Sequence, residues 1–468
     1  MDTLLQLLLI SLGTITFVAI LRRSTRHAPY SPILPTVKIS DPAIAQRLLF
    51  DHADAFSNRP TRAFPLDFSG GRYHGISTTP YGPVWRTLRR GLTADILHPT
   101  RLSLQEPLQR EAVEGLVASL TLGEVVVRHS IRGALYMLMA RLCFGDGVDA
   151  RDVRAMERAQ MVFLTTYAEV MAIEGSRLPR ILHLRRYLRF DAAFNRLSKI
   201  VGTLIVARLH QVSCCDRGGG DGGILPYVDS LLDIQVPDDE RVDARRMLTV
   251  TEMAPLVWEF IVAGAESVAS SVEWALAHLV DQPEVQKKLH REINGAEGLV
   301  VREEQLRSMP YLRAVVLECL RMHPPVPFQN REVGAEGAAL GGATVPAMAS
   351  MTTTRFTLMA SDIGRNSKAW TEPDEFRPER FLAGGEGEGV GPVPGPKEIK
   401  MIPFGAGRRY CPGAGMGMVL IGCVLCALVR EFEWAPSGQS AGVDLTELDM
   451  FFKVMKKPLR ARITPRRR

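Results

Sequence analysis

The stretch Pro403–Gly413 reads PFGAGRRYCPG, and an apolar run typical of a buried helix, GMGMVLIGCVLCALV, follows soon after it. A cysteine at the start of a helix has its thiolate stabilised by the helix dipole and by the backbone N–H groups of the first turn. Cys411 holds this position, with glycines on both sides that let the backbone approach a bulky, flat group. Arg408 and Arg409 add positive charge that suits an acidic ligand. The pattern predicts a ligand-binding cysteine rather than a structural one.

Two other interpretations of this region fail on spacing. A zinc site could use the Cys423-x-x-Cys426 pair, but no second cysteine or histidine pair lies at ligand spacing. Both cysteines lie on the apolar run, so we expect them in the core. A nucleotide-binding loop would need GxGxxG, or GxxxxGK followed by serine or threonine, and neither occurs in this segment.

The composition limits the class of protein. The chain has 468 residues, of which 46% are hydrophobic and 23% charged, and these values exclude a disordered chain. The seven cysteines are odd in number and sparse, so they suit a reducing compartment rather than a disulfide framework. A net charge of +6 is compatible with an anionic membrane surface or an acidic partner protein. It is weak support for nucleic acid, which we do not expect as a partner.

The N-terminus contains an apolar segment, Leu4–Leu21, with no charged residue and with three arginines in the next five positions. The segment is just long enough to span a bilayer, and the arginines predict that the downstream chain stays in the cytoplasm. A cleaved signal peptide would carry its basic residues before the apolar run. We therefore expect a transmembrane anchor over 1–22, a proline-containing linker over 23–35 and one large catalytic domain over 36–468.

Helical periodicity dominates this domain, and strand-like segments are short. The absence of strand–helix alternation argues against a doubly wound sheet. The sequence therefore predicts a mainly α protein with small β-sheets. The expected helices cover residues 82–98, 101–120, 128–143, 152–172, 190–213 and 251–280, and the expected strands cover 36–40, 339–345 and 451–464.

The cysteine segment resembles the haem-binding signature of the cytochrome P450 superfamily, the haem-thiolate monooxygenases. Five positions carry the likeness: Phe404, Gly407, Arg409, Cys411 and Gly413. The segments Tyr81–Arg86 and Val454–Leu459 resemble the plant microsomal branch of that superfamily. The resemblance implies the cytochrome P450 fold and a haem b (heme) cofactor whose iron has the thiolate of Cys411 as its axial ligand. It also implies that the other four residues surround the cofactor.

Glu318 and Arg321 lie three residues apart on an expected helix, which by itself indicates a surface ion pair. The segment Phe376–Phe381 (FRPERF) contains Arg380. In the family, a matching Glu-x-x-Arg pair is buried and is joined by an arginine from such a loop. The resemblance therefore implies a structural triad of Glu318, Arg321 and Arg380.

Trp85 and Arg89 lie four residues apart, which alone indicates an amphipathic basic helix. The resemblance implies that both donate hydrogen bonds to the haem propionates. Glu266 and Ser267 interrupt the apolar segment 251–280, and buried polar groups of this kind need partners or a task. They resemble the family's oxygen-activation segment, in which an acid and a threonine relay protons. Serine at 267 departs from that pattern.

The resemblance implies a monooxygenase that inserts one oxygen atom from O₂ into a lipophilic small molecule. Since no dinucleotide fingerprint follows an expected strand, electrons should come from NADPH through a separate NADPH–cytochrome P450 reductase. Together with the anchor, the resemblance implies a single-pass protein of the endoplasmic reticulum membrane whose catalytic domain faces the cytoplasm. Basic side chains suited to docking an acidic partner are Arg86, Arg90, Lys397, Lys400 and Arg408.

Two alternatives stay open at this point. One is a haem-thiolate isomerase or dehydratase, which would need neither O₂ nor a reductase; the retained acid Glu266 argues against it. The other is a non-catalytic haem-binding paralogue, suggested by Ser267 and by a short N-terminal sheet. We expect Ser31–Ser40 to supply at most one strand, where the family has two paired strands.

Overall fold

The computed structural model describes residues 36–60, 75–173, 180–214, 223–237, 244–295, 302–334, 353–438 and 442–466. The expected anchor over 1–22, the linker over 23–35 and the expected strand over 339–345 lie outside the described residues. The described part is mainly helical with small sheets, so the predicted fold class is confirmed.

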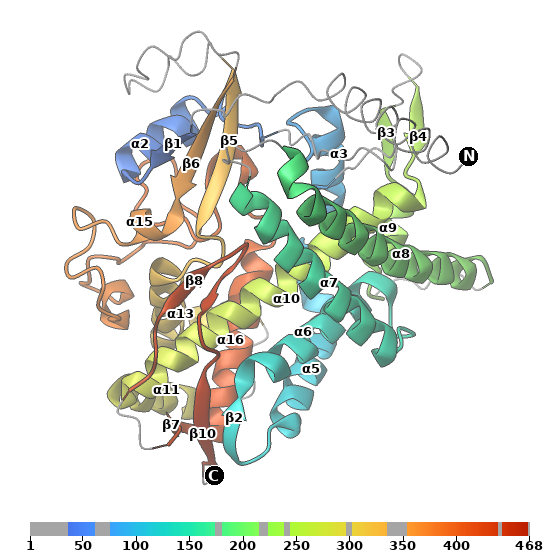
Figure 1. The fold of residues 1–468 in the computed structure, drawn as a ribbon. Coiled ribbons are helices and arrows are strands. Elements are labelled where there is room, and N and C mark those ends of the chain that lie inside the picture. The colour runs from blue at the N-terminus through green and yellow to red at the C-terminus, as the bar shows by residue number, and fades with distance from the viewer. Residues whose placement is uncertain are drawn as a thin grey trace, which may run out of the picture.

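Two long apolar helices form the centre of the molecule (Figure 1). Helix α10 (Val250–Asp281) begins with a capping box, in which Thr249 and Glu252 each bond the backbone N–H of the other. Helix α16 (Ala414–Glu431) begins directly after the cysteine segment and packs against α10. Both are long and apolar enough to cross a membrane, but most of their residues are buried inside the protein. They are core helices.

The remaining α-helices surround this pair, and each expected helix has a counterpart among the described α-helices, that over 251–280 being α10. The expected helix over 101–120 is split in two where a proline follows Glu106. The described helices are α2 (Pro42–Gln46), α3 (Pro83–Gly91), α4 (Pro99–Leu104), α5 (Glu106–Ser119), α6 (Val127–Phe144), α7 (Ala150–Ile173), α8 (Leu184–Cys214), α9 (Tyr227–Leu232), α11 (Pro283–Asn294), α12 (Glu303–Arg307), α13 (Pro310–Met322) and α15 (Ala360–Gly364).

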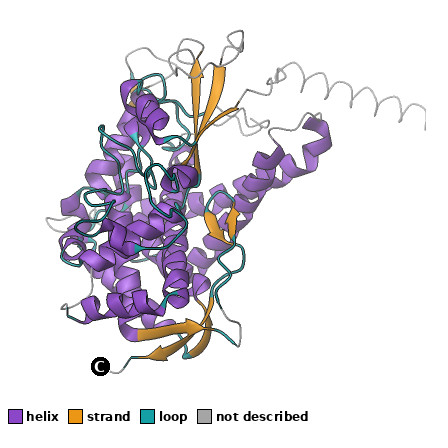
Figure 2. Ribbon diagram, turned by 90° about the vertical axis from the view of Figure 1, so that its left-hand side faces the viewer, coloured by secondary structure: helices purple, strands orange, loops and turns teal. Residues whose placement is uncertain are grey.

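The strands form four small sheets, and the two of three strands lie at opposite ends of the molecule (Figure 2). In the first sheet, β1 (Thr36–Ile39) runs parallel to β6 (Thr353–Met359), which pairs with β5 (Phe328–Gly334). The second has the order β2–β10–β7, and two hairpins complete the set. The strands concerned are β2 (Gly123–Val126), β3 (Gln235–Pro237), β4 (Arg245–Met247), β7 (Phe432–Pro436), β8 (Glu447–Asp449), β9 (Lys453–Met455) and β10 (Arg460–Pro465).

Two hydrophobic cores fill the described part of the chain. The larger core surrounds α10 and α16. The smaller one lies between the first sheet and α2, and it includes Ile39, Leu48, Phe356 and Ile402. Strand β1 therefore joins both a sheet and a core, because its residue Ile39 is buried in the smaller cluster.

Two neighbouring histidines, each stacked on another aromatic ring, lie in the interior between α10 and the end of α13. The Nε2 atoms of His278 and His323 are 2.8 Å apart, and Nδ1 of His323 is 2.8 Å from Oε1 of Glu447. Trp274 stacks on His323 with 3.9 Å between ring centroids, and Phe376 stacks on His278 at 4.1 Å. A neutral pair fits this chain of bonds, with Nδ1 of His323 donating to Glu447 and Nε2 of His278 donating to His323.

Burial disfavours the charged form of both rings. It holds the pKa of His278 well below its ordinary value, and the positive charges of Arg365 and Arg321 add to the effect. It lowers the pKa of His323 to about 4, although Glu447 opposes the shift. Both histidines are therefore neutral in the folded protein under conditions in which an unfolded chain would protonate them.

We expect the free energy of unfolding to fall as the pH decreases from about 6.5 to about 4, because the unfolded state then binds protons that the folded state refuses. The loss from His323 alone is about 3 kcal/mol over this window. Urea unfolding at a series of pH values measures it. His323→Gln should flatten the slope, whereas His98→Gln, which changes an exposed histidine, should leave the slope unchanged. Equal slopes in all three proteins would contradict this assignment.

Candidate active site

The cysteine segment is a tight loop held by a backbone hydrogen bond from Cys411 N–H to Phe404 O, with 2.7 Å between N and O. Gly405 and Gly407 have φ angles of +73° and +67°, a left-handed region that favours glycine. A Cβ atom at Gly407 would lie 2.5 Å from the carbonyl oxygen of Leu49. Backbone conformation therefore requires glycine at 405 and 407, and close packing also requires it at 407, whereas Gly413 has a φ of −89° that other residues adopt.

Cys411 is partly exposed, unlike the other cysteines whose exposure the structure describes. Those four are buried: Cys143, Cys319, Cys423 and Cys426. Burial raises the pKa of the Cys411 thiol, while the backbone N–H of Gly413 and the positive charge of Arg89 oppose the rise. A partly exposed cysteine beside a helix start and a cation can reach a ligand, and the four buried cysteines cannot.

Arg409 and Trp85 lie together and bind backbone carbonyl groups. The buried guanidinium of Arg409 donates to the carbonyl oxygens of Ser57, Ile76 and Thr79 at 2.8, 3.3 and 2.7 Å. Its central carbon is 4.4 Å from the centroid of the Trp85 ring, and Nε1 of Trp85 donates to Ile76 O at 3.1 Å. These two expected site residues therefore also fix the segment around residues 76–79.

Arg89 lies between two aromatic rings near Cys411. Its guanidinium is 4.9 Å from the centroid of the Tyr410 ring and 5.9 Å from that of Trp85. Burial lowers the pKa of Arg89, while Tyr410 and Cys411 oppose the shift. The structure thus brings Trp85 and Arg89 together with the cysteine loop, which the spacing alone did not predict and the resemblance implies.

Arg331 on β5 was missed by the sequence analysis. It is fully buried, and its Nε and Nη2 atoms have no hydrogen-bond partner among the described residues. Burial and the positive charges of Arg59 and Arg409 hold the pKa of Arg331 well below its ordinary value. A buried guanidinium without a counter-charge costs several kcal/mol. In the sequence Arg331 is only one arginine in a strand, and nothing marks it as a site residue, because its neighbours in space come from distant segments.

These arginines provide a test of whether haem fits this chain. Haem carries two propionate groups, which are negatively charged and accept hydrogen bonds. Arg331 has buried donors without partners, and Arg409 and Arg89 lie on the side of the cysteine loop. An acidic ligand would supply the missing counter-charge. The donor set therefore fits a dianionic group next to a partly exposed cysteine.

One face of α10 stays accessible although the rest of the helix is buried. Ala263 is exposed, and Gly264 and Ser267 are partly exposed, at positions that share one side of the helix. Ser267 Oγ donates to the carbonyl oxygen of Ala263 at 2.5 Å. The Ser267 hydroxyl therefore lies on the side of the helix that the described residues leave partly exposed.

Glu266 points away from this face, toward α6. It is buried, with Oε1 2.9 Å from Arg132 Nε, and it accepts a hydrogen bond of 3.0 Å from the Tyr136 hydroxyl. Burial raises the pKa of Glu266, and Arg132 opposes the rise. No hydrogen bond among the described residues joins Glu266 to Ser267. The structure thus does not bring the two expected catalytic groups into one hydrogen-bonded pair.

The structure brings Glu318, Arg321 and Arg380 together in the interior. Both oxygens of Glu318 accept from Arg321, at 2.7 and 2.8 Å, and both side chains are fully buried. Arg380 Nε lies 3.2 Å from Glu318, and the backbone N–H of Arg377 donates to it at 2.8 Å. The geometry excludes the surface ion pair that the spacing alone indicated.

The basic residues expected at a docking surface differ in exposure. Arg86, Arg90, Lys397 and Arg408 are exposed. Lys400 is only partly exposed, and its Nζ donates to the carbonyl oxygen of Glu386 at 2.8 Å. Lys400 therefore contributes to the fold rather than to an open surface.

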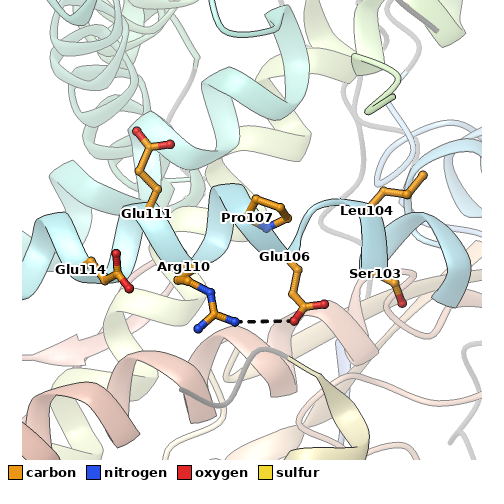
Figure 3. Close-up of a pocket in the computed structure, with 7 residues that line it drawn as sticks. All are labelled: Ser103, Leu104, Glu106, Pro107, Arg110, Glu111 and Glu114. Carbon is orange, nitrogen blue, oxygen red and sulfur yellow. Dashed lines mark ion pairs between the residues drawn. The ribbon is translucent and has the colours of Figure 1, made fainter. Parts of the chain in front are cut away.

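A surface pocket of about 550 Å³ lies elsewhere, along α4 and α5 (Figure 3). Its lining residues are Ser103, Leu104, Glu106, Pro107, Arg110, Glu111 and Glu114. None of them belongs to the cysteine loop, to α10 or to the arginine cluster. In this pocket the charges of Arg110 and Glu106 already pair with each other. We therefore place the candidate site at Cys411 and not in this pocket.

Comparison with known proteins gives a consistent result. A family model for Cytochrome P450 matches residues 33–464. The chain is 32% identical to Cytochrome P450 89A9 of Arabidopsis thaliana over 465 residues, covering 95% of this chain and 88% of that protein. It is 30% identical to Flavonoid 3'-monooxygenase CYP75B137 of Crocosmia x crocosmiiflora, covering 88% of this chain and 80% of that protein.

Solved structures share the fold. A zebra fish cytochrome P450 with abiraterone matches with a TM-score of 0.68 and 20% identity, covering 92% of this chain and 93% of that one. The retinoic acid-bound cyanobacterial CYP120A1 matches with a TM-score of 0.69 and 19% identity, covering 92% and 88%. At these identities the likeness shows the fold alone.

We expect Arg321→Ala to destabilise the protein by about 3–5 kcal/mol, because it leaves the Glu318 carboxylate buried without its partner. The matched control is Arg307→Ala, which removes an exposed ion pair to Glu303 and should cost about 1 kcal/mol or less. Soluble yield and urea unfolding of the two variants measure the difference. Wild-type stability in Arg321→Ala would show that the pair contributes little.

Proposed function

This chain belongs to the cytochrome P450 family of haem-thiolate monooxygenases, and from that premise we propose that Cys411 is the axial ligand of its haem iron. The observation that carries the proposal is the partly exposed Cys411 beside the start of α16, since the other cysteines whose exposure the structure describes are buried. When bound, the haem supplies oxygen chemistry, and a thiolate ligand favours cleavage of the O–O bond. The protein binds and orients the cofactor and the substrate, and it supplies protons.

In this proposal the arginine cluster binds the haem propionates. Arg331 offers two donors without partners, while Arg409 and Arg89 add positive charge near the cysteine loop. Trp85 supports them by packing against both Arg409 and Arg89. Charge-assisted hydrogen bonds of this kind are roughly twice as strong as neutral ones, so they orient the cofactor as well as hold it.

In this proposal Ser267 and Glu266 have different roles in proton transfer. Ser267 presents a hydroxyl at the accessible face of α10, where a reacting group can receive a proton. Glu266 is the nearby acid, and burial raises its pKa, so it binds a proton more readily than an exposed carboxylate does. This pair supports a monooxygenase over an isomerase or dehydratase, which needs no supply of protons.

We propose a lipophilic small molecule as the substrate. Aromatic side chains gather where α7, α8 and α10 meet, with Phe163 contacting Phe190, Phe194 and Trp258. The named relatives include a flavonoid 3'-monooxygenase and a 2-hydroxyisoflavanone synthase, whose identities to this chain are 30% and 28%. These names support an apolar, ring-containing substrate and do not select one compound.

The electron source in this proposal is NADPH, through NADPH–cytochrome P450 reductase. Arg86, Arg90 and Arg408 are exposed near Trp85 and the cysteine loop, and they suit an acidic partner surface. We propose the endoplasmic reticulum membrane as the location, with a single-pass anchor over 1–22 and the catalytic domain facing the cytoplasm. The apolar segment Leu4–Leu21 and the arginines that follow it support this topology.

We expect Cys411→Ser to abolish the ferrous–CO absorption band that is typical of thiolate-ligated haem, because the ligand atom is lost. Cys423→Ala changes a buried sulfur on α16 and should keep the band. The measurement is the ferrous–CO difference spectrum of each purified protein, read together with its haem content. A thiolate band that survives in Cys411→Ser and is lost in Cys423→Ala would overturn the assignment.

We expect Ser267→Thr to improve the coupling of NADPH consumption to product, because a β-branched side chain restricts χ1 and holds the hydroxyl in place. Ser267→Ala should worsen coupling and release more peroxide. Glu266→Gln should lower turnover more than it weakens substrate binding, since it removes a proton-carrying group. Product, NADPH and peroxide are measured together. Three variants that match the wild type would exclude this proton path.

A further inference from the structure

Helix α10 carries four glutamates at intervals of seven residues, and three of them pair with an arginine. The ion pairs are those of Glu252 with Arg246 at 2.7 Å, Glu266 with Arg132 at 2.9 Å and Glu273 with Arg128 at 2.6 Å. The fourth glutamate, Glu259, has no ion pair among the described residues. Its carboxylate is therefore bound less firmly than the other three.

Glu259 contacts the segment 75–79 instead of an arginine. Its Oε1 accepts a hydrogen bond from the Ser77 hydroxyl, and its Oε2 accepts one of 3.4 Å from the Ser77 backbone N–H. A Cβ atom at Gly75 would overlap the same carboxylate, so glycine is needed there for the contact. Ser77 is exposed, and water can satisfy its hydroxyl when another donor takes its place on Glu259. The partner of Glu259 is therefore exchangeable, unlike a buried arginine.

Glu259 lies at the border of the accessible face of α10. It is partly exposed, and it precedes Ala263 by one helical turn and Ser267 by two, a spacing at which side chains are neighbours along a helix. At 1.5 Å per residue, about 12 Å of helix separate Glu259 from Ser267. The residues on either side of it, Trp258 and Phe260, each pack against another aromatic ring. The carboxylate is thus a hydrogen-bond acceptor in mostly aromatic surroundings.

We propose that Glu259 is a specificity residue that binds a hydrogen-bond donor of the substrate, an O–H or N–H group. The inference rests on the proposed function, in which the reacting group lies near Ser267. The substrate is then an elongated, ring-containing molecule whose donor lies on the order of 10 Å from the carbon that is oxidised. On binding, this donor displaces the Ser77 hydroxyl from the carboxylate.

The charges around Glu259 favour a donor and disfavour an acidic substrate. Burial raises the pKa of Glu259, whereas hydrogen bonds from Ser77 and from the Ile76 backbone, and the more distant charge of Arg59, oppose the rise. The carboxyl group keeps an oxygen that accepts hydrogen bonds in either protonation state. In the ionised state the bond is charge-assisted and stronger. A substrate carboxylate or phosphate would instead meet a like charge.

Equilibrium dialysis with two probes of the same shape measures this preference. The probe para-hydroxybiphenyl carries a donor at one end of two linked rings, and para-methylbiphenyl has a methyl group in its place. The selectivity ratio is the Kd of the methyl probe divided by that of the hydroxyl probe, measured on the haem-loaded ferric protein. We expect Glu259→Met to lower this ratio about tenfold, because a hydrogen bond to a charged group is lost. Glu259→Gln keeps an acceptor and should lower the ratio less.

The variant Ser77→Ala separates a binding role of Glu259 from a structural one. Both Ser77→Ala and Glu259→Met remove the side-chain contact between α10 and the segment 75–79, so a purely structural role gives the same change in both. If Glu259 binds the substrate, Ser77→Ala removes a competing donor, and we expect the ratio to rise about threefold. The matched control is Glu252→Gln, seven residues earlier on the same helix, which should keep the wild-type ratio.

These measurements decide the inference separately from the proposed function. A ratio that falls in Ser77→Ala as it does in Glu259→Met would overturn the inference. An unchanged ratio in both Glu259 variants, or a wild-type protein that binds neither probe, would also overturn it, and Glu259→Gln decides if Glu259→Met does not fold. Dialysis requires neither turnover nor thiolate ligation. A wild-type protein without the thiolate CO band would therefore overturn the proposed function, and the probe ratios would still report binding by Glu259.

Discussion

A buried guanidinium needs partners on every side, and the Arg321 side chain imposes this requirement on the second half of the chain. It binds Glu318 on its own helix and the carbonyl oxygens of Gly364, Pro373 and Glu375 on the segment that follows. That segment leads to the cysteine loop. Since each of these carbonyls must reach one fixed charge, a short stretch of helix α13 determines the path of a long irregular region.

The candidate site also contains a buried guanidinium, but there the described residues do not supply every partner that it needs. Arg331 is buried with donors that the described residues do not satisfy, and Arg409 and Arg59 lie close enough to lower its pKa. An anionic cofactor that binds only the folded protein adds its binding free energy to the stability of the fold. Haem in this site would therefore contribute to folding as well as to chemistry.

Features that depend on local spacing could be predicted from the sequence, whereas features that depend on packing between distant segments could not. The cysteine loop depends on contiguous residues, so Cys411 and its glycines were predictable, as was the face shared by Glu318 and Arg321. Arg132 and Arg331 acquire their meaning from segments far away in the chain, which periodicity cannot reveal. The mainly α class followed from periodicity, but the sheet partners depend on tertiary pairing, as in the parallel β1–β6 pair.

The close approach of Gly407 to the Leu49 carbonyl oxygen also has an evolutionary consequence. Any side chain at 407 would have to displace the π-helical turn over Arg47–Asp51, and with it the strand and helix of the smaller core. Changes in these two segments are therefore not independent. A lineage that altered one would be expected to alter the other in the same period, although nearly the whole catalytic chain separates them.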